Sequence, residues 1–196
     1  MNTHPLLIFI AAIFPHNIAL TYILGMCPLI AISKNVRAAF GMGISVIFVM
    51  TLTAMINWII YNLILLPTHS EIISYVIFII TIAASVQLVE IILERFFPPL
   101  QSAFGIFLPL ITVNCTVLAV SLFMVLRQYD FIRTVCFALG TGVGWALVIV
   151  TLAAIREKLL LIGDVPKGLK GPAITMILLG ILALAFMGFA GMVKIQ

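Results

Sequence analysis

Two cysteines, Cys27 and Cys115, each begin a similar short phrase inside a long apolar segment. The phrases read Cys27-Pro-Leu-Ile-Ala-Ile-Ser33 and Cys115-Thr-Val-Leu-Ala-Val-Ser121. A single buried cysteine is usually a small, inert hydrophobic residue. Two thiols in matching contexts instead favour a soft-metal or redox site, because thiolates suit zinc, copper(I) and iron–sulfur clusters.

The pair is an incomplete ligand set for such a centre. An iron–sulfur cluster commonly takes about four cysteines, and we interpret Cys136, at the start of another apolar segment, as structural. A cluster at Cys27 and Cys115 would therefore take its other ligands from a second chain, at a subunit interface. Beside the pair, Gly25 would let backbone approach sulfide closely, and Asn114 could donate a hydrogen bond to sulfur. For Asn114, hydrogen bonding between helices is an equal alternative.

The composition indicates lipid as the solvent for most of the chain. Of the 196 residues, 64% are hydrophobic and 8% are charged, whereas ordinary globular chains carry about 25% charged residues. Continuous apolar runs without alternation predict helices rather than a barrel, and each run reaches the roughly 20 residues that a bilayer requires. We expect an all-α membrane protein with a single integral domain over residues 1–196. The six predicted transmembrane helices cover residues 6–32, 38–66, 73–93, 100–126, 135–155 and 172–193.

The basic residues predict how the helices are oriented. The loops on one side receive seven of them and those on the other side receive three: Lys34, Arg37, Arg95, Arg156, Lys158, Lys167 and Lys170, against Arg127, Arg133 and Lys194. Because cytoplasmic loops carry the excess of Lys and Arg, the first side is expected in the cytoplasm and both termini on the external side. The basic residues do not form a nucleic-acid patch, and no nucleic-acid partner is expected.

The two halves of the chain resemble each other. Beyond the cysteine phrases, Val36-Arg-Ala-Ala-Phe-Gly-Met-Gly43 resembles Val135-Cys-Phe-Ala-Leu-Gly-Thr-Gly142, each following its cysteine at the start of the next helix. Three helices per half is an odd number, so two repeats, about 6–93 and 100–193, would insert with opposite topology. Coincidence among apolar residues is the alternative explanation.

Depth estimates agree with inverted repeats. Helical rise places Cys27 about 10 Å inside the cytoplasmic boundary and Cys115 about 12 Å from the same side of a core about 30 Å thick. The first and fourth helices, which carry the cysteines, are expected to be discontinuous, because proline and glycine interrupt helices. The residues that indicate these breaks are Pro15, Gly25, Pro28 and Pro109.

Two further polar features each have two possible interpretations. Glu90, near the cytoplasmic end of the third predicted helix, is either a residue of an ion or proton path or a carboxylate that reaches the membrane surface near Arg95. The loop over residues 156–170 holds four basic residues and would bind either a redox partner or anionic lipid. No phosphate-binding loop, nucleotide-binding turn or catalytic triad is present in the sequence, so substrate conversion is expected on other subunits.

Several phrases together resemble one known family across essentially the whole chain. They resemble the E subunit of Nqr, the sodium-translocating NADH:quinone oxidoreductase, and the closely similar A subunit of the Rnf ferredoxin:NAD⁺ oxidoreductase complex. The phrases are Leu24-Gly-Met-Cys27, Gly105-Ile-Phe-Leu-Pro-Leu-Ile-Thr-Val-Asn-Cys115, Gly142-Val-Gly-Trp145, Ile155-Arg-Glu-Lys158 and Asp164-Val-Pro166.

The resemblance implies a fold, a cofactor and a partner. Such a subunit is a six-helix inverted repeat in a bacterial or archaeal cytoplasmic (inner) membrane. It pairs with a homologous, oppositely oriented subunit, Nqr D-type or Rnf E-type, and each chain contributes two cysteines to one intramembrane 2Fe-2S cluster. Cys27 and Cys115 match those positions. The complex passes electrons between cytoplasmic and external subunits and couples this flow to Na⁺ or H⁺ movement, so the chain is expected to be a subunit of an ion-translocating oxidoreductase.

The phrases divide between the two complexes. Those at Phe96-Phe-Pro-Pro-Leu100, Thr112-Val-Asn-Cys115, Gly142-Val-Gly-Trp145 and Arg156-Glu-Lys158 favour Nqr E, whereas the short segment after Pro67 and the ending from Phe186 to Lys194 favour Rnf A. Our interpretation leans to Nqr E. The rival from another class is a small six-helix transporter or channel with structural cysteines. It requires polar residues that converge at mid-membrane, and Glu90 is the main candidate.

Overall fold

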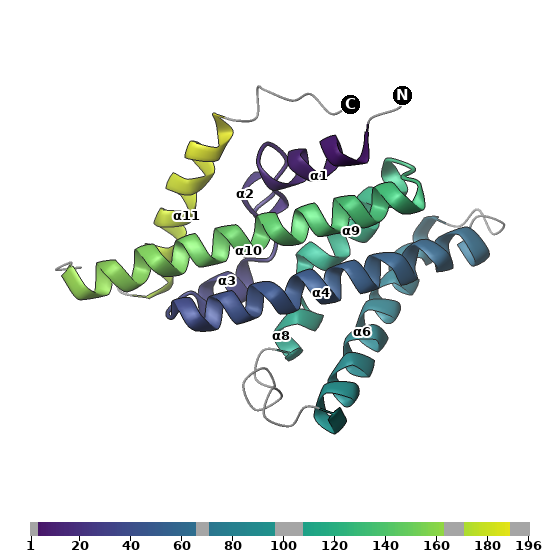
Figure 1. Cartoon of the computed structure of the whole chain (residues 1–196), viewed down its shortest axis with the longest axis horizontal. Helices are drawn as coiled ribbons and strands as arrows, with labels where there is room; N and C mark the ends of the chain where they lie inside the picture. The colour runs from purple at the N-terminus through teal and green to yellow at the C-terminus, as the bar shows by residue number, and fades with distance from the viewer. Residues whose placement is uncertain (1–3, 66–70, 97–107, 163–170, 189–196) are drawn as a thin grey trace.

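The computed structural model describes residues 4–65, 71–96, 108–162 and 171–188 (Figure 1). In all four stretches the regular secondary structure is helical, and none of them contains a strand. The predicted all-α class is therefore confirmed for this part of the chain.

Two long antiparallel helices form the centre of the molecule. They are α4 (Val36–Ile60), which continues into the π-helix η1 (Tyr61–Leu65), and α10 (Phe131–Ile162), and they make the most extensive helix–helix contact (Figure 1). Among the described helices, those over Val36–Ile64 and Phe131–Leu161 are each long and apolar enough to cross a membrane.

Glycines allow α4 and α10 to approach closely. A methyl group on Gly43 would lie 2.9 Å from the Ala146 Cβ, and one on Gly142 would lie 3.1 Å from the Ile47 Cα. Small residues at such a crossing let two backbones pack directly, which is how helices associate in a membrane. The two glycines therefore fix the distance between the central helices.

The first apolar run forms three short helices. These are α1 (Pro5–Ile13), α2 (Ile18–Thr21) and α3 (Met26–Ile32). Asn17 starts α2 as its N-cap, because its side-chain oxygen accepts a hydrogen bond from the Ala19 N–H at 3.1 Å. The second interruption contains Ile23 at φ 55° and Gly25 at φ 75°. Left-handed residues cannot continue a right-handed helix, so α3 begins afresh just before Cys27.

The fourth apolar run is interrupted at one place within the described residues. Helix α8 (Leu108–Thr112) ends before α9 (Cys115–Leu126), and Asn114 caps α9 by accepting a hydrogen bond from the Thr116 N–H at 3.1 Å. Pro28 and Pro109, two of the residues expected to indicate breaks, lie where helices begin. Each lies in the first turn of a helix, α3 or α8, where the missing N–H of proline costs nothing.

The remaining helices flank the central pair. Figure 1 shows α6 (Glu71–Phe96) and α11 (Pro172–Met187) on opposite sides of α4 and α10. Helices α1 and α2 pack on α10 and α11, whereas α9 packs on α4 and α6. Each cysteine-bearing segment thus packs against the long helices from the other half of the chain, so the two halves are interleaved.

Residues that the matched phrases of the two halves align make corresponding hydrogen bonds. The alignment of the Val36 and Val135 phrases places Asn57 opposite Arg156, and the cysteine phrases place Ser33 opposite Ser121. The Asn57 amide donates to Ser121 Oγ at 2.7 Å, and the Arg156 guanidinium donates to Ser33 Oγ. Helix α4 therefore holds the segment of Cys115, and α10 holds the segment of Cys27.

Among the described residues, basic side chains lie at both ends of the central pair. The start of α4, next to Lys34, meets the end of α10, where the Val36 N–H donates to Glu157 Oε2 at 3.3 Å. Arg133 lies in the first turn of α10, at the opposite end. Arg156 departs from the expected loop position, because its side chain is 6% exposed and lies within α10.

The outward surfaces of α6 and α11 are strongly apolar. The exposed side chains include Ile80 and Leu88 on α6 and Ile181 and Leu184 on α11. An apolar surface of this kind is poorly suited to water and well suited to lipid or another membrane subunit.

We expect Gly142→Ala to lower the unfolding temperature in detergent. Its methyl group would meet the Ile47 backbone, and overpacking of this kind costs roughly 1–3 kcal/mol. Gly180→Ala on α11 is the matched control, since nothing lies within 4 Å of a methyl group there, and helix propensity would leave its unfolding temperature unchanged or slightly raised. Equal unfolding temperatures for the two variants would contradict the close contact of α4 and α10.

Candidate functional site

The two cysteine-bearing segments meet at Gly25. This residue is the N-cap of α3, two positions before Cys27. Its nearest neighbours across the fold include Asn114 and Thr116, the residues on either side of Cys115. The structure therefore brings the residue two positions before Cys27 into contact with both neighbours of Cys115.

Both thiols lie at the surface of the isolated chain. Cys27 and Cys115 are exposed, whereas Cys136 on α10 is partly buried. The Cys115 Sγ lies 4.0 Å from the Val113 carbonyl oxygen of the preceding turn. Exposure at an apolar surface leaves both sulfur atoms accessible to another chain.

Glycine is required at position 25 for two reasons. Its φ of 75° lies in the left-handed region, which disfavours any residue with a Cβ. A methyl group there would also lie 2.8 Å from both Asn114 Oδ1 and Trp145 Nε1, and closer still to Thr116 Oγ1. The bare face of Gly25, which the sequence analysis expected to admit sulfide, thus lies against polar side chains of the protein.

Polar atoms on three side chains around Gly25 lack hydrogen-bond partners among the described residues. They are Asn114 Nδ2, Thr116 Oγ1 and Trp145 Nε1. Their side chains are 3%, 0% and 0% exposed, in that order. A buried polar group without a partner costs roughly 1–3 kcal/mol, so three at one place is an unusual arrangement in an apolar protein.

Helix α10 holds this arrangement against the first segment. The Asn17 amide donates to the Gly144 carbonyl at 3.0 Å and to the Ile13 carbonyl at 3.1 Å. Gly144 is close enough to the first segment that a methyl group on it would lie 3.2 Å from the Ala12 carbonyl oxygen. The interruption after α1 is therefore attached to α10 next to Trp145.

The other residues singled out from the sequence are placed as follows. Asn114 caps its own helix rather than bonding to another helix. Glu90 lies on α6, but its side chain is outside the described part of the structure, as is the stretch 163–170 of the basic loop.

Thr116 and Trp145 are site residues that the sequence did not predict. Thr116 lies inside the second cysteine phrase, and Trp145 ends the phrase Gly142-Val-Gly-Trp145. The available signal was a tryptophan that follows two closely spaced glycines. Glycines mark a close approach between two helices, and a large side chain next to them can contact the same neighbouring segment.

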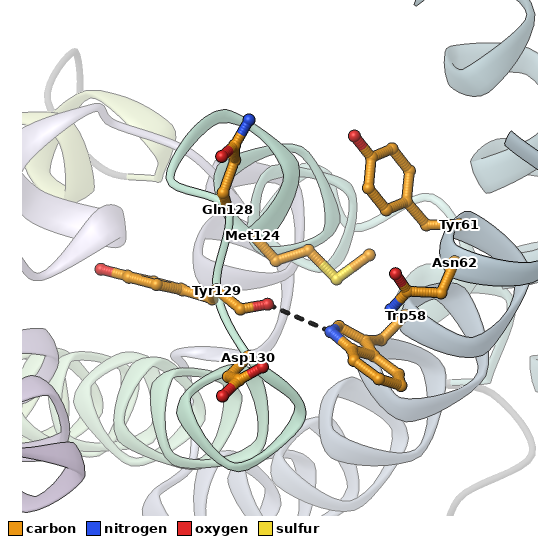
Figure 2. Close-up of a pocket in the computed structure, with 7 residues that line it drawn as sticks. All are labelled: Trp58, Tyr61, Asn62, Met124, Gln128, Tyr129 and Asp130. Atoms are coloured by element: carbon orange, nitrogen blue, oxygen red, sulfur yellow. Dashed lines mark hydrogen bonds between the residues drawn. The ribbon is translucent and has the colours of Figure 1, made fainter. Parts of the chain in front are cut away.

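A separate pocket lies at the far end of α9 from Cys115 (Figure 2). It encloses about 260 Å³, and the Trp58 indole N–H beside it donates to the Tyr129 carbonyl at 3.1 Å. In Figure 2 the Tyr129 ring points away from the other lining residues. The lining residues are Trp58, Tyr61, Asn62, Met124, Gln128, Tyr129 and Asp130. This pocket is not part of the cysteine site.

The described part of the chain does not hold a complete metal centre of its own. Within those residues, no group of three or more His, Cys, Asp or Glu side chains could hold a metal ion. The site consists of two exposed thiols beside three buried polar atoms.

Comparison with known families identifies the chain. A family model described as Rnf-Nqr subunit, membrane protein, matches residues 6–193. The chain belongs to this family, which confirms the resemblance found in the sequence. It is accordingly a membrane subunit of the Nqr and Rnf type, part of a multisubunit oxidoreductase that carries out electron transport together with other membrane subunits.

We expect Gly25→Ala to abolish correct folding, as measured by monodispersity and unfolding temperature in detergent. The substitution combines left-handed strain with collision against Asn114, Thr116 and Trp145. Gly171→Ala is the matched control, because Gly171 also has a positive φ of 110° but nothing lies within 4 Å of a methyl group there. Backbone strain alone costs roughly 1–3 kcal/mol, so the control should fold. A Gly25→Ala protein as stable as Gly171→Ala would refute the contact.

Proposed function

We propose that this chain is an electron-transfer subunit that supplies Cys27 and Cys115 as ligands to an intramembrane 2Fe-2S cluster. A homologous, oppositely oriented subunit of the Nqr D or Rnf E type would supply the other two. The observation that carries the proposal is the meeting of both cysteine segments at Gly25 with both thiols exposed. Family membership supports a role in a redox complex.

The residues present suit such a cluster. Thiolates are its usual ligands, and four are commonly needed, so two exposed thiols leave room for two from a partner. The buried polar atoms beside them include two N–H donors, which are the groups that stabilise negatively charged sulfur. When bound, the cluster supplies one-electron transfer within the bilayer, where protein side chains have no equivalent chemistry.

Inverted repeats account for the arrangement of helices. In this proposal α1–α3 form the first transmembrane segment, α8 and α9 form the fourth, and α4, α6, α10 and α11 are the others. The reciprocal bonds of Asn57 with Ser121 and of Arg156 with Ser33 support a pseudo-two-fold relation. The basic residues around Lys34 and Arg156 support a cytoplasmic position for that end and external termini.

We assign the chain to Nqr E in preference to Rnf A on the phrases around Cys115 and Trp145, with Na⁺ as the coupled ion and NADH and quinone converted on other subunits. The transporter alternative requires polar residues that converge at mid-membrane, whereas the pocket in Figure 2 lies where α4 continues into η1, next to the connection between α9 and α10.

Glu90 on α6 is the proposed ion-path residue. Glu90→Gln should reduce ion transport in proteoliposomes while electron transfer from the natural donor persists under uncoupled conditions. Full ion transport in this variant would remove Glu90 from the path and leave it as a carboxylate near the membrane surface, close to Arg95.

Cysteine substitutions test the proposed cofactor in the purified complex. Cys27→Ala or Cys115→Ala should remove the cluster's EPR signal, lower iron and acid-labile sulfide by one cluster, and stop electron flow through the complex. Cys136→Ala is the matched control and should retain all three. If Cys27→Ala and Cys115→Ala keep normal iron content and turnover, these cysteines are structural and the proposal fails.

A further inference from the structure

We propose that the Trp145 indole, the Thr116 hydroxyl and the Asn114 amide donate hydrogen bonds to sulfur at the cysteine pair and raise the reduction potential there. This inference rests on the proposed function, since the acceptor is cysteine or sulfide sulfur of the cluster. It adds two residues, Thr116 and Trp145, that have a positioning and tuning role rather than a ligand role.

The first observation is the convergence of the three atoms. Trp145 Nε1, Thr116 Oγ1 and Asn114 Nδ2 are buried and lack partners among the described residues. Trp145 Nε1 and Thr116 Oγ1 lie directly beside the Cβ position of Gly25, and Asn114 reaches the same position with its Oδ1. Gly25 lies two residues before Cys27, and Thr116 and Asn114 adjoin Cys115. The unpartnered atoms are therefore gathered where the two cysteine segments meet.

The chemistry of the atoms specifies what can partner them. An indole N–H can only donate, and the Asn114 oxygen already accepts from the Thr116 N–H, which leaves the amide hydrogens as donors. The Thr116 hydroxyl can also donate. A set made mainly of donors needs an acceptor, and the start of α9, a helix of 12 residues, also favours negative charge.

Under the proposed function, the acceptor next to these three side chains is sulfur of the cluster or of its cysteine ligands. Reduction adds one electron and therefore one negative charge to the cluster, so hydrogen bonds to its sulfur atoms stabilise the reduced form more than the oxidised form. The potential rises as a result. An ordered water molecule is the other acceptor that fits a buried polar site. In that case the three side chains would not affect the reduction potential of the cluster.

The test measures the midpoint potential of the cluster in the intact complex by EPR-monitored redox titration. Thr116→Val removes only the hydroxyl from a side chain of the same shape, and Trp145→Phe removes the indole N–H. Both should shift the potential to more negative values, whereas Thr116→Ser should restore the wild-type value. Thr134→Val is the control, because Thr134 is a second buried hydroxyl without a described partner, on α10 but away from Gly25.

A measurement on the wild-type complex covers the case in which a variant fails to assemble. With ¹⁵N-indole tryptophan incorporated, pulsed EPR should detect nitrogen coupling to the reduced cluster. Absence of this coupling, or a wild-type potential in assembled Thr116→Val and Trp145→Phe, would overturn the inference in favour of water as the only partner. Absence of any cluster in the wild-type complex would instead refute the proposed function.

Discussion

The contact of the Gly25 backbone with Asn114, Thr116 and Trp145 is the constraint on which the candidate site depends. It joins the N-terminal ends of α3 and α9 to the middle of α10 and requires a residue without a side chain. Other contacts also hold these helices together. Glycines bring α4 and α10 together, and the Asn17 amide attaches the first segment to Gly144. The positions of both cysteines therefore depend on one small, tightly packed region.

The interleaved halves explain why two distant cysteines share a location. Each cysteine segment packs on the long helices of the other half, and each has a serine that accepts a hydrogen bond from those helices, Ser33 from Arg156 and Ser121 from Asn57. Buried hydrogen bonds of this kind fix register in an apolar environment, where packing alone discriminates poorly between positions. A change in either half would thus be felt at both cysteines.

The sequence alone predicted the helical class, the lipid environment and the family, because these follow from composition and from contiguous phrases. The prolines Pro28 and Pro109 lie in the first turns of α3 and α8, so they mark where these helices begin. The burial of Arg156 and the position of Trp145 against Gly25 could not be predicted, because each depends on how distant helices cross. The unpartnered polar atoms are likewise a property of the packed fold, and no local pattern marks them.

A high-resolution cryo-EM structure of the intact complex tests the central claim most directly. The account predicts density for two iron atoms that bridges Cys27 and Cys115 Sγ to two thiolates of the partner subunit, with Gly25 packed against Asn114, Thr116 and Trp145. Cys27 and Cys115 facing acyl chains, or separated from each other with no metal density at the subunit interface, would contradict it.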